Sequence, residues 1–366
     1  MRSPVSEPFY GERLRLARLL ATQSLDEVGG AVAASRQYLH QLETETKTPT
    51  PEMRRALADA LGVTVNFFSL PLTTSVSEAD CHFRKLYTTP RAAMAHAAAR
   101  GTLVEQLAKS LERRVRLPKV DFPDLGRPSS LAEVEEKAIA ARDHWGLGRD
   151  APLANLTRVL ERAGALVIDF SDISEKVDAL SISRRRPIVV RSSAKAAAVR
   201  VRFDLAHECG HLLMHHGLAT GDTETEDEAH RFAGAFLFPA PAFLKEFPRT
   251  KSIDWTTLYS LKVRWKMSVR AMVRRAYELG VIDAAKYRTA NIHLSKSGQT
   301  RFERYDDQIE AEQPEMLRSA LRSLAAKDVI SYHRLMHEVG LNHDRFSVLL
   351  GVAAPEIPKN VTVANF

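Results

Sequence analysis

The sequence predicts an α+β fold that is mainly α-helical with one small β-sheet. Three observations lead to this prediction. Apolar residues recur every three to four positions along most of the 366 residues, which is the helical spacing. Three short runs, 165–170, 178–183 and 187–191, follow one another closely and predict neighbouring strands. A His-Glu-x-x-His sequence at 207–211 follows in a segment that is apolar nearly all round, so a buried helix should carry it.

Four regions follow from these patterns and from the proline-containing breaks between them. We expect a five-helix domain at 1–72 and a helical linker at 73–128. The sheet and the histidine helix should form a core at 129–248, followed by a helical C-terminal region at 249–366.

The composition predicts a cytoplasmic protein with no membrane partner. No run approaches the ~18 apolar residues of a membrane helix, and the N-terminus, which begins Met1-Arg2-Ser3-Pro4, has no apolar stretch of the kind found in a signal peptide. Cys81 and Cys209 are the only cysteines, and we expect no disulfide between them.

The formal net charge of +7 is concentrated in one stretch. Residues 81–120 contain nine lysines and arginines but only two acidic residues, Glu105 and Glu112, whereas bases and acids balance in residues 1–70. The excess fits contact with a phosphate backbone, and it fits a solvated helix face equally well.

Residues 10–72 predict five short helices with one polar outer face. Ser24 with Glu27 three positions later forms a capping box that begins the second helix. After a turn at 33–34, Ser35 caps a third helix at 36–43. The outer side of this helix carries groups that match the donors and acceptors of base edges in the major groove. We expect DNA contacts from Ser35, Arg36, Gln37, Tyr38, His40 and Gln41.

This stretch resembles the XRE/Cro-type helix-turn-helix, through Leu39 and Leu42 in the third helix and the pattern of residues 49–63. It departs at Ala33, where that family usually has glycine in the turn. The resemblance implies a double-stranded DNA operator. Because the domain's charges balance, a monomer should bind weakly, and a homodimer that reads two half-sites is expected. The alternative is a helical bundle that serves only for dimerisation.

The linker region predicts an alanine-rich helix from Pro90 to about Val115. Before it, Cys81 and His82 stand next to each other. Such a pair can bind a metal, but without further partners it is more typical of packing.

Between 129 and 200 the pattern predicts helices at 132–145 and 155–163, and then the sheet. A small sheet beside helices that carry metal ligands suggests how a peptide would bind. An extended substrate segment would add to the edge strand and lie across the metal.

On the expected helix at about 200–216, His207 and His211 lie one turn apart and can point at one place. Two imidazoles in that arrangement suit Zn²⁺, with nitrogen ligands at roughly 2.0–2.1 Å. Glu208 can lean over the metal and take a proton from water, whose pKa Zn²⁺ lowers to about 7. The alternative is a chance occurrence of the five-residue pattern.

A third ligand is expected downstream, and Glu226 is the best candidate because helical steps from it reach the apolar face of its helix. Asp227, Glu228 and Arg231 fall on the solvent side, with Glu228 as the fallback ligand.

Two further histidines are candidates for contacts with the ligands. His230 lies one turn after Glu226 and is either an extra ligand or a hydrogen-bond partner of one. His215 lies four residues after His211 and is a candidate partner of that ring. Solvent exposure of His215 and His216 is the alternative, and the sequence favours it.

Residues 207–211 and 226–239 resemble the ImmA/IrrE (DUF955) metallopeptidases, through Ala-His-Glu-x-Gly-His and then Glu-x-x-Ala-x-x-Phe-Ala-x-x-Phe-Leu-x-Pro. The resemblance implies a zincin-like fold and cleavage of a cognate repressor. It also implies Glu208 as general base and one Zn²⁺ per chain, held by His207, His211 and Glu226.

The chain departs from that pattern at Cys209, where an aliphatic residue is usual, and at His230, where asparagine is common. Neither change removes a ligand. His82-Phe83-Arg84 recurs in proteins that fuse an XRE domain to this peptidase, so the resemblance extends across the junction.

The helices expected at 255–264 and 268–279 resemble a second helix-turn-helix, with Arg270, Arg274 and Arg275 on the outer face. In the ImmA/IrrE family this region lies against the peptidase, so packing is the first interpretation and a nucleic-acid surface the second. Residues 283–366 predict helices at 316–327, 331–339 and 346–350, for which a partner-binding or dimerisation tail is our only suggestion.

The sequence thus predicts a DNA-binding transcriptional regulator with a zinc-dependent endopeptidase domain that cleaves a repressor-type protein. The alternative from another class is a transcription factor that uses a non-catalytic zinc fold as a sensor or partner-docking domain. A third is an interaction module of a toxin–antitoxin or phage-control system. Intact ligands without turnover would favour the sensor.

Overall fold

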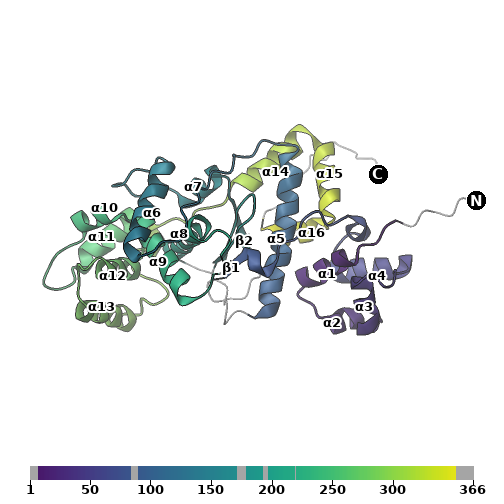
Figure 1. Ribbon diagram of the computed structural model, residues 1–366, viewed down its shortest axis with the longest axis horizontal. Helices are drawn as coiled ribbons and strands as arrows, with labels where there is room; N and C mark the ends of the chain where they lie inside the picture. The colour runs from purple at the N-terminus through teal and green to yellow at the C-terminus, as the bar shows by residue number, and fades with distance from the viewer. Residues whose placement is uncertain (1–6, 84–89, 171–178, 193–196, 219, 352–366) are drawn as a thin grey trace, which may run out of the picture.

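The computed structural model describes residues 7–83, 90–170, 179–192, 197–218 and 220–351 (Figure 1). Helices make up most of these residues, and one four-stranded mixed sheet lies near the middle. The predicted class, mainly α with a small sheet, is confirmed. Among the described helices, none combines the length and the apolarity that crossing a bilayer requires.

The N-terminal helices form where the sequence predicts them. Ser24 and Glu27 make the predicted capping box, and the Ser35 hydroxyl accepts the backbone N–H of Tyr38. The fifth predicted helix is a single short 3₁₀ segment, η1. The elements are α1 (Gly11–Leu20), α2 (Leu25–Ala31), α3 (Arg36–Glu43), α4 (Pro51–Leu61) and η1 (Val65–Ser69).

The turn between α2 and α3 is tight. Ala33 has a φ of +52°, a left-handed conformation that costs an L-residue roughly 1–2 kcal/mol. A Cβ on Gly29 would lie 2.5 Å from the carbonyl oxygen of Ala34, so only glycine allows this close approach. The turn therefore forms without the glycine usual at position 33, under local strain.

The long helix predicted in the linker is α5 (Arg91–Glu112), and it is a buried support. Every residue from His96 to Glu105 is buried. The Arg100 guanidinium lies 3.4 Å from the ring centroid of Phe170 and donates to the carbonyl of Leu349. Arg100 of the basic stretch 81–120 is thus used inside the molecule, so a solvated helix face does not describe it.

The three predicted strands are β2 (Leu166–Phe170), β3 (Ala179–Ile182) and β4 (Ile188–Ser192). β4 pairs parallel with β2 and antiparallel with β3. A fourth strand, β1 (Cys81–Phe83), pairs antiparallel with β3, so the strand order is β1-β3-β4-β2. The sequence missed β1 because three residues are too few to show the alternation of a strand.

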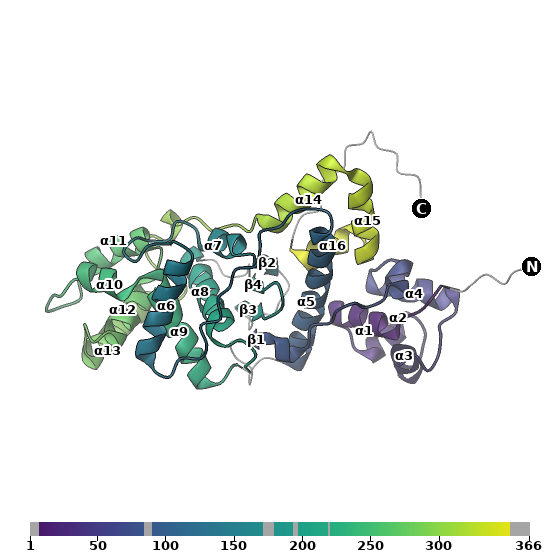
Figure 2. The ribbon, with the colours of Figure 1, turned by 45° about the horizontal axis from the view of Figure 1, so that its top comes forward.

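Helices cover both faces of the sheet (Figure 2). α8 (Ala198–Met214) and α7 (Leu156–Arg162) lie on one face. α5 lies on the other, together with the C-terminal helices. Along β3, Leu180 and Ile182 point into the α5 side, whereas Ser181 points toward α8.

Outside α8, further helices build an outer layer around the histidine helix. α9 packs on α8 and on α6, and α12 packs on α9. This layer consists of α6 (Leu131–His144), α9 (Thr223–Leu237), α10 (Ala240–Glu246), α11 (Trp255–Trp265), α12 (Val269–Glu278) and α13 (Ala284–Lys296).

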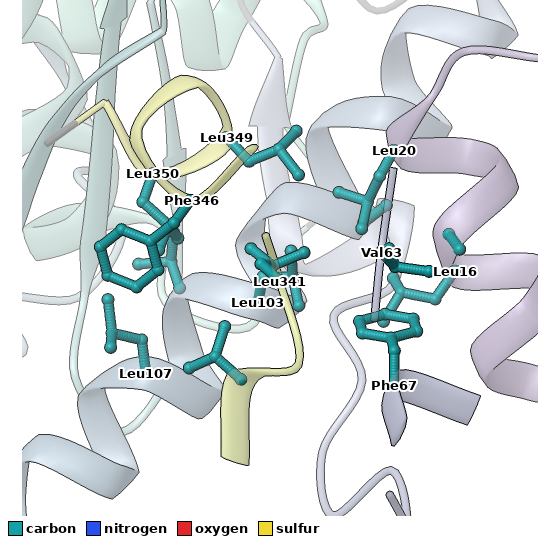
Figure 3. Packing of buried hydrophobic residues seen from close by; sticks show 14 of the residues in the cluster. Leu16, Leu20, Val63, Phe67, Leu103, Leu107, Leu341, Phe346, Leu349 and Leu350 are labelled. Carbon is teal, nitrogen blue, oxygen red and sulfur yellow. The ribbon is translucent and has the colours of Figure 1, made fainter. Parts of the chain in front are cut away.

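The C-terminal helices join the N-terminal domain to the sheet. They are α14 (Met316–Lys327), α15 (Val329–Val339) and α16 (His343–Leu350). The Thr64 N–H donates to the Gly340 carbonyl, and Val63 forms a β-bridge with Leu341. Figure 3 shows the core that the N-terminal domain, α5 and the C-terminal region share. Its labelled side chains are Leu16, Leu20, Val63, Phe67, Leu103, Leu107, Leu341, Phe346, Leu349 and Leu350. The C-terminal helices thus contact the N-terminal domain, a role the sequence did not indicate.

Candidate metal centre

The centre begins with α8, which is buried along almost its whole length. His207 and His211 are each 1% exposed and lie one turn apart on this helix. Their Nε2 atoms are 3.1 Å apart, with the ring planes at 77°. The two rings therefore present nitrogen donors to one point, as the sequence predicts.

Glu226 of α9 completes a group of three donors. Its carboxylate oxygens lie 3.4 Å from Nε2 of His207 and 3.3 Å from Nε2 of His211. α9 comes this close because Gly210 has no side chain, and a Cβ there would meet the Phe232 ring at 3.0 Å. The described residues contain this one group of donor atoms that all lie within 4.8 Å of one another.

The donor spacing fits a tetrahedral Zn²⁺ ion. Bonds of about 2.0–2.1 Å at tetrahedral angles place two donors about 3.3 Å apart. The three separations here are 3.1, 3.3 and 3.4 Å. Two imidazoles and one carboxylate also match the donor set of catalytic zinc sites, which leave a fourth position open.

The charge of Glu226 suits this position. Burial opposes its ionisation, but the interactions with His207 and His211 outweigh burial and lower its pKa to about 2. The carboxylate is therefore ionised at neutral pH, which a metal ligand requires.

The side chain of Glu208 points from α8 toward the sheet. It is fully buried, and its Oε2 accepts a hydrogen bond of 2.6 Å from the Ser181 hydroxyl of β3. This contact fixes the carboxylate between the sheet and the helix. No local pattern in the sequence indicates Ser181, because its contact with Glu208 depends on the packing of β3 against α8.

Behind His211, a chain of hydrogen bonds sets the ring's orientation. Nδ1 of His211 lies 2.9 Å from Nδ1 of His215, and Nε2 of His215 lies 2.8 Å from Oε2 of Glu228. If His215 donates from Nε2 to the carboxylate, its Nδ1 accepts the Nδ1–H of His211. That tautomer leaves the Nε2 lone pair of His211 facing Glu226 and His207.

This chain corrects two expectations. His215 is fully buried, not exposed, and burial lowers its pKa to about 3, so the ring is neutral. Glu228 is buried rather than on the solvent side, and it binds His215 instead of serving as a fallback ligand. The helical pattern misplaced both residues because α9 packs on α8, which brings Glu228 of α9 against His215 at the end of α8.

The other two histidines lie outside the donor group. His230 is partly exposed, with its ring centroid 4.8 Å from that of Phe203. It does not belong to the described group of donors, so nothing supports its role as an extra ligand. His216 is exposed, as expected, and its Nδ1 lies 3.0 Å from the Ser183 hydroxyl.

His82 of β1 reaches the centre from the linker. Its ring stacks parallel to His211, with centroids 5.4 Å apart and planes at 4°. Its Nδ1 lies 2.8 Å from the Thr220 hydroxyl, and burial, followed by the nearby His211, lowers its pKa to about 4. The sequence favoured simple packing for this residue, and the structure places it beside a candidate ligand.

The predicted DNA-contacting residues lie together at α3. Ser35, Arg36, Gln37 and His40 are exposed, and Tyr38 and Gln41 are partly exposed. Leu39 and Leu42 face the core. Arg36 makes an exposed ion pair of 3.0 Å with Asp26.

The second helix pair, α11–α12, does not present an arginine face. Arg275 is 1% exposed and binds the Phe238 carbonyl and the Glu135 carboxylate, so its predicted outward position is wrong. Arg274 pairs with Glu278, and Arg270 donates to Asn291. Packing, the first interpretation, is what the structure has.

Comparison with known proteins agrees with this geometry over part of the chain. Residues 160–277, from α7 to α12, match the family model of the IrrE N-terminal-like domain, Peptidase_M78. The match covers the three donors and Glu208, and it indicates a metallopeptidase-type domain in this range. The N-terminal helices, β1 and α14–α16 lie outside it. No curated protein matches the chain.

Proposed function

We propose that this protein is a DNA-binding regulator with a zinc-dependent endopeptidase domain that cleaves a repressor-type protein. The observation that carries the proposal is the convergence of His207, His211 and Glu226 beside the buried Glu208. A structural zinc site would have four protein ligands, and only three donors converge among the described residues.

His207, His211 and Glu226 would hold Zn²⁺, which acts as a Lewis acid and lowers the pKa of water to about 7. Glu228, through His215, keeps the His211 ring in the tautomer and orientation that binding requires. Such contacts behind a ligand are typically worth about 10–100-fold in metal affinity or activity.

Glu208 moves the proton. Its carboxylate accepts a proton from water as the water oxygen attacks the peptide carbonyl carbon. The C–N bond then breaks, and Glu208 returns the proton to the amine nitrogen that leaves. Ser181 holds one carboxylate oxygen throughout, so the base keeps a fixed direction during both transfers.

The DNA-binding half of the proposal rests on α3. Its exposed polar face and the serine-capped N-terminus suit entry into a major groove, where Arg36 and Gln37 would meet base edges. Two copies reading two half-sites would supply the affinity that a charge-balanced domain lacks. A repressor-type substrate is proposed because a regulator that reads DNA and cleaves protein acts most directly on another DNA-bound regulator.

The test compares wild type with Glu208→Gln in cells that lack the native protein. We expect zinc at one ion per chain in both proteins and new protein termini only with wild type, with a loss of at least about 10²-fold in the variant. Glu224→Gln removes an exposed acid of the same helix as Glu226 and serves as the matched control, with unchanged cleavage. Equal proteolysis by wild type and Glu208→Gln would refute the assignment.

The second candidate is a sensor that regulates DNA binding without proteolysis. It is favoured by one observation: α5 packs against α1 on one side and against the sheet beside α8 on another. Metal at the centre could then change the position of α3. This candidate predicts that chelation alters operator affinity several-fold while no cellular protein is cleaved.

A further inference from the structure

Strand β1 occupies an unusual place, and what we infer from it rests on the proposed peptidase function. β1 comes from the segment before α5, almost a hundred positions from its partner β3 in the sequence. It forms the outer neighbour of β3 at one edge of the sheet (Figure 2). Cys81, His82 and Phe83 pair with Ile182, Ser181 and Leu180, respectively.

The contacts beneath this strand pair define where a peptide must lie. Under β3, Ser181 binds the general base Glu208. Directly across from Ser181, on β1, the His82 ring stacks on the candidate ligand His211. Neighbouring strands lie about 4.8 Å apart, so β1 is one strand spacing outward from β3. Glu208 therefore lies beneath β3, and the candidate ligand His211 lies beneath β1. A carbonyl attacked between base and metal needs the strand position that β1 holds.

We propose that β1 is an internal occupant of the substrate strand position, and that a substrate binds by replacing β1 on β3. The substrate is an extended, unfolded segment of another protein, which pairs with β3 antiparallel through its main chain. The peptidase is closed while β1 is in place. A signal or partner that draws β1 away opens it.

The contacts of β1 are few enough for replacement. The Ser183 N–H donates to the Asp80 carbonyl at the end of the pair, and Arg184 lies 3.4 Å from the Asp80 carboxylate. His82 adds its contact with Thr220. β1 pairs over three residues, whereas β2 and β4 pair over five and lie inside the core. A short strand pair at the edge of a sheet opens locally more often than longer, buried strand pairs of the same sheet.

Pairing within one chain still favours β1 over a free peptide. A tethered strand competes at an effective concentration of about millimolar. A substrate segment therefore gains access mainly when β1 is released, which makes the strand a switch.

The first test locks β1 in place with a disulfide. The Ser183 N–H donates to the Asp80 carbonyl, which puts the adjacent Cys81–Ile182 pair at a non-hydrogen-bonded position of the ladder, where opposite Cα atoms lie about 4.5 Å apart. Ile182→Cys thus offers the native Cys81 a partner within disulfide range. Oxidation of the zinc-loaded variant should lower Glu208-dependent cleavage of β-casein at least tenfold, and reduction should restore it. The matched control, Cys81→Ser with Ile182→Cys, should be insensitive to the oxidant. Equal cleavage by the locked and reduced forms overturns the proposal.

The second test separates strand release from a role of the imidazole. His82→Pro removes a backbone N–H from the pair and should release β1, raising β-casein cleavage at least tenfold. His82→Ala removes the same imidazole but keeps the N–H, so its cleavage should stay at least tenfold below that of His82→Pro. If both variants lose activity, β1 is part of the active site and the proposal is wrong.

The third test does not need catalysis. A fluorescein-labelled peptide of residues 77–83, with serine for Cys81, should bind zinc-loaded Glu208→Gln/His82→Pro at least tenfold more tightly than Glu208→Gln. Equal peptide binding by the two variants would contradict the proposal that β1 occupies the substrate strand position. A binding difference without β-casein cleavage by any variant supports β1 as the occupant and refutes the peptidase assignment, so the two failures are distinguishable.

Discussion

The helix pairs α2–α3 and α11–α12 turn in the same way. Each has a non-glycine residue in the left-handed conformation, Ala33 at a φ of +52° and Lys266 at +50°. Two residues later a serine, Ser35 or Ser268, caps the next helix by accepting a backbone N–H from three positions on. Over these turns the two pairs have the same local structure.

Their outer faces differ completely. The polar face of α3 is open to solvent. The N-terminus of α12 is covered by Glu303, whose carboxylate accepts the N–H groups of Val269 and Arg270. Arg275 is buried against Glu135. The same local turn is therefore not sufficient to predict an exposed second helix, because neighbouring elements decide whether that helix is covered.

The largest expected effect is the loss of unfolding free energy in Arg275→Ala. Removing the buried guanidinium leaves the Phe238 carbonyl without this donor and the Glu135 carboxylate with Arg231 as its remaining cationic partner, at a cost of about 3–5 kcal/mol. Guanidinium unfolding followed by circular dichroism measures this. Arg274→Ala, on the same helix but partly exposed, is the control, with an expected cost under about 1 kcal/mol. Similar costs for both would mean that α12 is not packed as described.

The next largest effect concerns DNA. Gln37→Ala on α3 should weaken binding to DNA selected by the wild-type protein by about 1–3 kcal/mol, with unfolding free energy unchanged within about 0.5 kcal/mol. Fluorescence anisotropy measures the affinity. Arg270→Ala on α12 should leave affinity within twofold of wild type. A greater loss with Arg270→Ala would make α12 the DNA reader and reverse the comparison.

The caps should behave alike in the two pairs. Ser35→Ala and Ser268→Ala each remove one acceptor for a backbone N–H, which costs about 0.5–2 kcal/mol. Because Glu303 also accepts N–H groups at the start of α12, Ser268→Ala should lie at the lower end. Thermal unfolding of the two variants tests this order, and a cost that is larger for Ser268→Ala contradicts it.

The smallest expected effect is a gain in unfolding free energy. Ala33→Gly relieves the left-handed strain but adds chain entropy to the unfolded state, for a net stabilisation of about 0.5–1 kcal/mol. Lys266→Gly should gain less, because it also loses the hydrogen bond from Nζ of Lys266 to the Ala154 carbonyl. A destabilised Ala33→Gly would show that the turn is not strained.

Within the candidate centre, local spacing predicted the part that lies on one helix. The four-residue separation of His207 and His211 follows from helical geometry, and Glu226 was placed by the apolar face of its own helix. Ser181, Glu228 and His82 needed contacts between distant segments. His82 lies 129 positions before His211, and no periodicity within a window relates two such residues.

What the sequence determined by itself is local: the helix that carries the histidines, the capping serines, three of the four strands and two similar turns. These features depend on residues within a few positions of one another. Three other features depend on the folded arrangement: Arg275 is buried, His215 leads to Glu228, and β1 lies beside the candidate metal ligands. Burial and strand pairing depend on which surfaces meet after folding, and that meeting is fixed by the packing of the whole chain.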